Sequence, residues 1–112
     1  MQKFEYRTPR YQVDFPVLLA LESTSIHGRC REISREGMRV ELHEAVTPEA
    51  CGTVSFSYKE LSLEVPVCVA RSGAGQGGLR FVFESEKDRG PVDRLVALLA
   101  GATGQPGPTL VR

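Results

Sequence analysis

Apolar and polar residues alternate one by one along most of this chain, and this alternation favours β-strands throughout. Consecutive side chains of a strand point to opposite faces, so such a segment buries one face and exposes the other. In the first segment the apolar positions are Val13, Phe15, Val17, Leu19 and Leu21. The same alternation predicts further strands over residues 27–33, 38–43, 53–58, 61–69 and 79–83.

Turns separate these strands, and one helix follows them. Lys59-Glu60 is the expected hairpin tip, residues 72–77 are expected to form a flexible turn, and Gly37 is expected to supply the positive φ of a tight turn. A helix is predicted from Pro91, which suits a first helical position, to Gly101, which is expected to end it. Its apolar stripe is Val92, Leu95, Val96 and Leu99.

Six short strands and one helix predict an all-β domain. We expect a small antiparallel barrel, because closure leaves no exposed strand edge, with the helix plugging or flanking one mouth. The 112 residues suffice for one modest core. The expected organisation is an N-terminal basic arm over residues 1–10, the barrel with its helix over 11–100, and a flexible tail over 101–112.

Charge and cysteine content restrict the class of partner. Fourteen basic residues balance fourteen acidic ones, so the chain has no bulk attraction to nucleic acid or to an anionic membrane. No apolar run reaches the length of a membrane helix, and residues 1–10 lack the apolar core of a secretory signal. Cys30, Cys51 and Cys68 are predicted to be small buried thiols in a reducing compartment, which favours a cytoplasmic protein.

The residues that suggest a ligand site lie in the basic arm and at one junction between strands. Arg7 and Arg10 carry guanidinium groups. One guanidinium group can bind two phosphate oxygens at once, and it can also contact guanine. Glu32 and Ser34 are two residues apart and share a strand face, where a carboxylate accepts from the N–H groups of a base. Gly37 leaves the backbone unobstructed. Together they favour an anionic ligand with a guanine-like base.

These residues resemble the motifs of the PilZ domain family. That family pairs R-x-x-x-R before the first barrel strand with [D/N]-x-S-x-x-G between the second and third strands. The run from Arg10 to Val17 resembles the segment that begins at the second motif arginine, and residues 32–40 resemble the second motif with its continuation. Gly78-Leu79-Arg80-Phe81 resembles a late strand of the family. The resemblance spans roughly residues 4–100 and implies a six-stranded antiparallel PilZ-type β-barrel with a C-terminal helix.

The resemblance implies a non-catalytic bacterial signalling domain that binds cyclic di-GMP and engages an effector protein. Cyclic di-GMP would be a ligand, and no cofactor is expected. In that interpretation the arginines bind the phosphates and contact a guanine face, whereas Glu32 and Ser34 form hydrogen bonds with the guanine edge. Two positions depart from the motifs: Tyr6 stands where the first arginine belongs, beside Arg7, and Glu32 replaces Asp or Asn. The alternative is a protein–protein adaptor that kept the scaffold and no longer binds the nucleotide.

Simpler roles remain open for the same residues. Ser34 could accept a backbone N–H near Gly37, and Glu32 could pair with Arg7 or Arg10 and hold the arm against the barrel.

Three other patterns favour no further activity. The glycine-rich run 73–78 joins two strands, whereas phosphate loops precede a helix. The run 27–30 holds a histidine and a cysteine without a second ligand pair, so no metal site is expected. Asp14, Ser34 and His43 lack the sequence context of a catalytic triad, so an enzyme is not expected.

Overall fold

The computed structural model describes residues 9–73 and 75–103. Six strands precede a short 3-10 helix, η2 (Glu86–Arg89), and an α-helix, α1 (Gly90–Thr103). The strands are β1 (Tyr11–Leu21), β2 (Ser25–Ile33), β3 (Gly37–Leu42), β4 (Cys51–Tyr58), β5 (Leu61–Gly73) and β6 (Gln76–Phe81).

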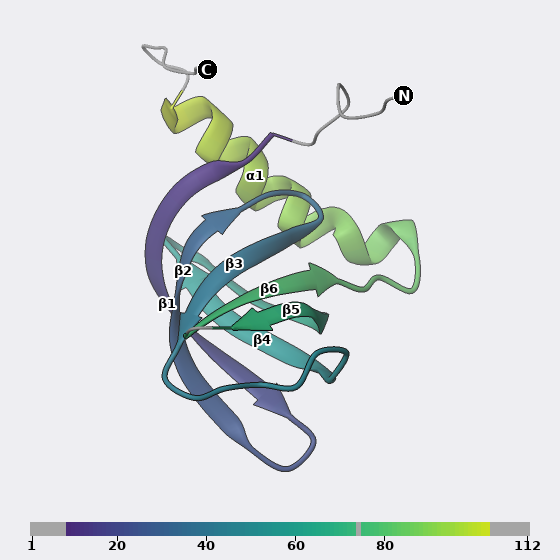
Figure 1. Ribbon diagram of the computed structural model, residues 1–112. Coiled ribbons are helices and arrows are strands. Elements are labelled where there is room, and N and C mark those ends of the chain that lie inside the picture. Colours follow the sequence, from purple (N-terminus) through teal and green to yellow (C-terminus); the bar gives the residue numbers. More distant parts are fainter. Residues whose placement is uncertain (1–8, 74, 104–112) are drawn as a thin grey trace, which may run out of the picture.

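The six strands form a closed antiparallel barrel in the order β1-β2-β3-β6-β5-β4. Pairing of β1 with β4, for example Val17 with Phe56 and Leu19 with Val54, closes the ring. Figure 1 shows the strands wrapping around one another while α1 lies across one end of the barrel. The six-stranded antiparallel barrel with a C-terminal helix, predicted from the alternation, is confirmed.

The alternating apolar side chains fill the inside of the barrel. Leu19, Val40 and Val54 are fully buried, and each such side chain contributes roughly 1.5–3 kcal/mol through burial. The helix adds its stripe to the same core, since Leu95 is fully buried and Val92 is nearly so. The predicted helix stripe is confirmed, and it closes one mouth of the barrel. Within the described residues no helix is long and apolar enough to cross a membrane.

Several element boundaries differ from the prediction by a few residues. Strand β6 ends at Phe81 and not at Phe83. Val82 still donates its N–H to the Pro66 carbonyl on β5, but proline has no N–H to donate in return. Helix α1 passes Gly101, which weakens a helix without ending it, and continues to Thr103.

The prediction of a positive φ at Gly37 is wrong. The turn between β5 and β6 contains Gly75, with a φ of 79°, and among the described glycines it alone has a positive φ. Gly37 is required for a different reason: a Cβ there would collide with the backbone carbonyl of Leu79 on β6. The flexible turn expected over 72–77 is also shorter, because β5 and β6 occupy most of it.

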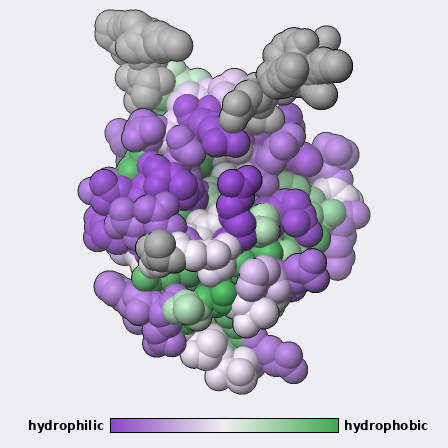
Figure 2. Space-filling view, in the orientation of Figure 1, coloured by the Kyte–Doolittle hydropathy of each residue, from purple (hydrophilic) through white to green (hydrophobic). Residues whose placement is uncertain are grey.

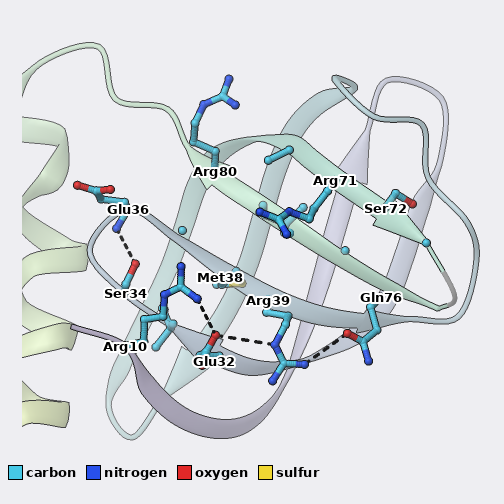
Figure 3. Close-up of a pocket in the computed structure, with 17 residues that line it drawn as sticks. Arg10, Glu32, Ser34, Glu36, Met38, Arg39, Arg71, Ser72, Gln76 and Arg80 are labelled. Carbon is cyan, nitrogen blue, oxygen red and sulfur yellow. Dashed lines mark hydrogen bonds and ion pairs between the residues drawn. The ribbon is translucent and has the colours of Figure 1, made fainter. Parts of the chain in front are cut away.

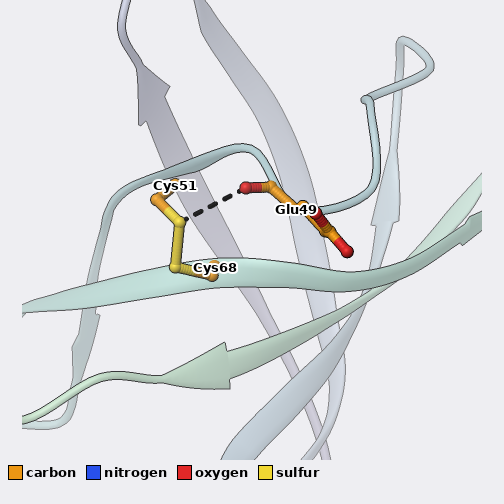
Figure 4. The surroundings of a disulfide bond; sticks show 3 residues. All are labelled: Glu49, Cys51 and Cys68. Atoms are coloured by element: carbon orange, nitrogen blue, oxygen red, sulfur yellow. Dashed lines mark hydrogen bonds between the residues drawn. A yellow bond between two sulfur atoms is a disulfide. The ribbon is translucent and has the colours of Figure 1, made fainter.

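The prediction of three free thiols is wrong for two of the cysteines. Cys51 and Cys68 lie directly opposite each other on β4 and β5 and form a disulfide, with 2.03 Å between the sulfurs (Figure 4). The backbone carbonyl of Glu49 lies 3.4 Å from the Cys51 sulfur. Cys30 is free and fully buried, and desolvation raises the pKa of its thiol to about 12. The cysteines therefore no longer argue for a reducing compartment.

Candidate ligand-binding groove

A surface groove of about 760 Å³ crosses β2, β3, β6 and the end of β5. This volume lies within the usual range of small-molecule sites. Four arginines and two glutamates line the groove, which gives a formal charge of +2: Arg10, Arg39, Arg71, Arg80, Glu32 and Glu36 (Figure 3). Hydrophilic side chains also gather over β2 and β3 in Figure 2. An anionic ligand suits this surface.

The ladder places the groove side chains in one row across four strands. Glu32 pairs with Arg39, Arg39 with Gly78, and Gly78 with Arg71. Opposed residues of antiparallel strands point to the same face of the sheet, here the outer face of the barrel. Neighbouring strands lie about 4.8 Å apart, so the row extends about 14 Å from Glu32 to Arg71.

Glu32 stands between two arginines. Its Oε1 lies 3.6 Å from Nη1 of Arg10 and 3.8 Å from Nε of Arg39, and its side chain is 21% exposed. Arg39 also donates from Nη1 to Oε1 of Gln76 at 3.5 Å. The proposed pairing of Glu32 with Arg10 is thus confirmed. Partly exposed ion pairs of this kind contribute at most about 1 kcal/mol to stability. A ligand could therefore take the place of either arginine as the partner of Glu32 at a small cost in free energy.

The turn between β2 and β3 is fixed by hydrogen bonds. Ser34 donates its backbone N–H to the Gly37 carbonyl at 2.9 Å, and its Oγ accepts the Glu36 N–H at 3.1 Å. Phe81 donates its N–H to the Glu36 carbonyl at 2.9 Å, which ties the turn to the end of β6. The predicted backbone role of Ser34 is confirmed. Its hydroxyl proton remains free to donate to a ligand, since only an oxygen lone pair is used.

The PilZ domain family matches residues 5–101 of the sequence. The chain belongs to the PilZ domain family. No curated protein sequence matches the chain.

Solved structures show the same fold. The chain is similar to the PilZ domain of CeSA from a cellulose-synthesizing bacterium, with a TM-score of 0.73 and 21% identity over 82% of this chain and 98% of that one. It resembles an uncharacterized Legionella protein with a TM-score of 0.59 and 19% identity over 88% and 97% of the two chains. It also resembles apo MrkH of K. pneumonia, with a TM-score of 0.70 and 11% identity over 96% and 55%.

Four of the five residues predicted for the site line this one groove of the PilZ barrel. Arg10 lies directly before β1, Glu32 near the end of β2, Ser34 in the turn, and Gly37 at the start of β3. The fifth, Arg7, lies outside the described residues, as does Tyr6.

The sequence prediction did not include three further arginines of the groove. Arg39 and Arg80 occupy outward positions between buried neighbours, so the alternation alone could have identified them. Arg71 could not be placed in this way, because the register of β5 against β6 shifts between Val69 and Arg71.

The other basic residues of β2 form ion pairs outside the groove lining. Asp14 accepts from Nε of Arg29 at 2.7 Å and lies 3.9 Å from Nη1 of Arg31. The hydrogen bond from Arg29 lowers the pKa of Asp14. These residues form an exposed, ion-paired part of the sheet surface. Among the described residues no cluster of histidine, cysteine and acidic side chains is suited to a metal ion.

Proposed function

We propose that this PilZ domain is a non-catalytic receptor for cyclic di-GMP in a bacterial cytoplasm. The proposed ligand-binding residues are Arg7, Arg10, Glu32, Ser34 and Gly37. PilZ domains are typically receptors for this second messenger. The observation that carries the proposal is that Arg10, Glu32 and Ser34 line a single groove of positive charge.

The groove chemistry matches the parts of a cyclic dinucleotide. The guanidinium groups of Arg10 and Arg39 suit phosphate oxygens, which they bind as forks. The Glu32 carboxylate suits the N–H donors on the guanine edge, and the Ser34 hydroxyl suits an acceptor of the base. Gly37 lines the same groove at the start of β3.

We expect the N-terminal arm, residues 1–10, to close over the bound nucleotide and to bring Arg7 to a phosphate. The barrel and helix over residues 11–100 would form the rigid body, and residues 101–112 a tail. The surface made by the closed arm would engage an effector protein. The ligand would be bound and released without chemical change.

Isothermal titration with cyclic di-GMP tests the proposal. Saturable heat is expected, and cyclic di-AMP is expected to bind more weakly because adenine lacks the N–H donor at its ring edge that suits a carboxylate. An absence of heat, together with no competition at high micromolar nucleotide, would exclude a cyclic di-GMP receptor.

A second function is favoured by one observation: Glu32 already contacts Arg10 and Arg39 within the protein. A groove with its charges paired internally suits a PilZ adaptor that binds a protein and no nucleotide. This alternative predicts that an Arg7→Ala, Arg10→Ala double variant captures the partner as the wild type does. Loss of capture in the double variant would contradict it.

A further inference from the structure

The Cys51–Cys68 disulfide lies on the outer face of the barrel. Cys51 is exposed at the start of β4, and Cys68 is half-buried at an outward position of β5. The two strands are also paired along the whole hairpin, from Cys51 with Cys68 to Tyr58 with Leu61. The ladder therefore holds β4 beside β5 whether or not the two sulfurs are bonded, so the bridge can open without a change of fold.

The surroundings of the bridge suit both of its oxidation states. The backbone carbonyl of Glu49 lies 3.4 Å from the Cys51 sulfur and can accept a hydrogen bond from the Cys51 thiol once the bridge is open. The third cysteine, Cys30, is fully buried inside the barrel, where it has no access to the pair. Exposed disulfides are commonly the labile or regulatory ones, and disulfides of cytoplasmic proteins are mostly transient or redox-sensing. In the cytoplasm proposed above, this bridge fits that class.

The bridge anchors β5 next to the ligand groove. Cys68 is paired with Arg80 on β6, and Arg80 is paired with Gly37 on β3. Arg80 and Gly37 both line the groove, and so do residues 70–73, which follow Cys68 on β5. The register shift of β5 against β6 lies between Cys68 and this lining segment. Since a ladder is disrupted at such a shift, the covalent anchor at Cys68 is well placed to hold the segment in position.

We propose that Cys51 and Cys68 form a reversible redox pair that raises the affinity of the groove when oxidised and lowers it when reduced. The inference rests on the proposed function and adds a regulation of the same site. In the oxidised protein the bridge holds residues 70–73 in place before the ligand arrives. In the reduced protein binding must first order this segment, and that ordering costs affinity.

Thiol–disulfide exchange with a thiol reductant opens the bridge. A thiolate of the reductant attacks the exposed Cys51 sulfur and forms a mixed disulfide, while Cys68 leaves as a thiolate and takes up a proton. A second thiol of the reductant then attacks the reductant sulfur of the mixed disulfide and releases Cys51 as a thiol. The reductant, a dithiol or two molecules of a monothiol, has lost two electrons and become a disulfide. A disulfide oxidant such as oxidised glutathione reverses both steps.

A thiol titration of the full chain under native conditions tests the redox pair itself. The protein is equilibrated in mixtures of reduced and oxidised glutathione, labelled with a maleimide and weighed by mass spectrometry. Cys51 and Cys68 are expected to gain and lose their label together and reversibly, whereas the buried Cys30 stays unlabelled. A bridge that stays closed in every mixture, or that does not form again after reduction, would overturn the proposal.

Calorimetric titration of cyclic di-GMP into the oxidised and the reduced protein tests the regulation. The reduced protein is expected to bind about 2- to 10-fold more weakly, as loss of preorganisation predicts. Its circular dichroism spectrum is expected to stay native, while the amides of residues 70–73 exchange faster with solvent.

The Cys51→Ala, Cys68→Ala variant is the matched control, because it lacks the bridge under all conditions. It is expected to bind as the reduced wild type does and to ignore the reductant. Equal affinities of the oxidised and reduced wild type, or a variant that binds as tightly as the oxidised protein, would overturn the regulation and leave the proposed function intact. A wild type that binds no cyclic di-GMP in either state would instead overturn the proposed function, and the regulation with it.

Discussion

Arg35 donates a hydrogen bond from its Nε to Oδ1 of Asp93 across 2.9 Å. Arg35 lies in the turn beside Ser34, and Asp93 lies in the first turn of α1. The hydrogen bond with Asp93 raises the pKa of Arg35, which stays charged. This contact joins the turn that lines the groove to the helix that closes the barrel.

Asp93→Asn is expected to loosen the turn without unfolding the protein. The side chains of Arg35 and Asp93 are 47% and 44% exposed, so loss of the pair should lower the free energy of unfolding by less than about 1 kcal/mol. Hydrogen exchange of the amides of residues 34–37 should become faster, because the turn loses one anchor. Arg94→Ala, on the same helix, is the control. Unchanged exchange in Asp93→Asn would show that the contact does not restrain the turn.

Ser34→Ala is expected to reduce both stability and nucleotide affinity. The buried Oγ of Ser34 accepts the Glu36 N–H, and loss of such a hydrogen bond costs about 0.5–1.5 kcal/mol. Urea unfolding measures the first effect and titration calorimetry the second. Ser57→Ala is the control, because the Ser57 hydroxyl shares an exposed hydrogen bond with Ser62 outside the groove. Equal stability of the two variants would contradict the role given to Ser34.

Reduction of the Cys51–Cys68 disulfide is expected to destabilise the barrel. The bridge closes a loop with a sequence separation of 17, for which constraint of the unfolded chain is worth about 3 kcal/mol. Urea unfolding with and without dithiothreitol measures the difference. The Cys51→Ala, Cys68→Ala variant should unfold identically under both conditions. Wild-type curves that coincide would mean that the bridge contributes nothing to stability.

Asp14 is expected to add stability that disappears in acid. Its folded-state pKa lies below its ordinary value of 3.8, mainly because of the hydrogen bond from Arg29. A lowered carboxyl pKa stabilises the folded state above the ordinary pKa, and the gain is lost as the pH falls through the folded value. The urea midpoint of Asp14→Asn should therefore lie below that of the wild type at pH 7, and the gap should shrink below about pH 4. A gap independent of pH would refute this assignment.

The sequence predicted the architecture because alternation records which side chains face inward. Val17, Leu19 and Val40 are buried as expected, and so is the helix stripe. The candidate site was predicted in part, since Arg10, Glu32 and Ser34 do line one groove. These positions could be predicted from the sequence because each lies beside a strand end, and the alternation shows where the strands end.

What could not be predicted depends on which strands become neighbours. The Cys51–Cys68 pairing requires the register of β4 against β5, and the place of Arg71 requires the shift of β5 against β6. Neither is contained in the alternation of one strand. The same holds for Gly37, whose need for glycine comes from the Leu79 carbonyl on β6 and not from its own turn.

The central claim is that cyclic di-GMP occupies the groove from the turn to Gly78. Titration of ¹⁵N-labelled protein with the nucleotide, followed through the backbone amide shifts, tests it most directly. The largest shifts are predicted for residues 32–37 and 76–80, with little change at Asp14 and Arg29 on the ion-paired surface outside the groove lining. Shifts confined to that surface, or no shifts at saturating nucleotide, would contradict the claim.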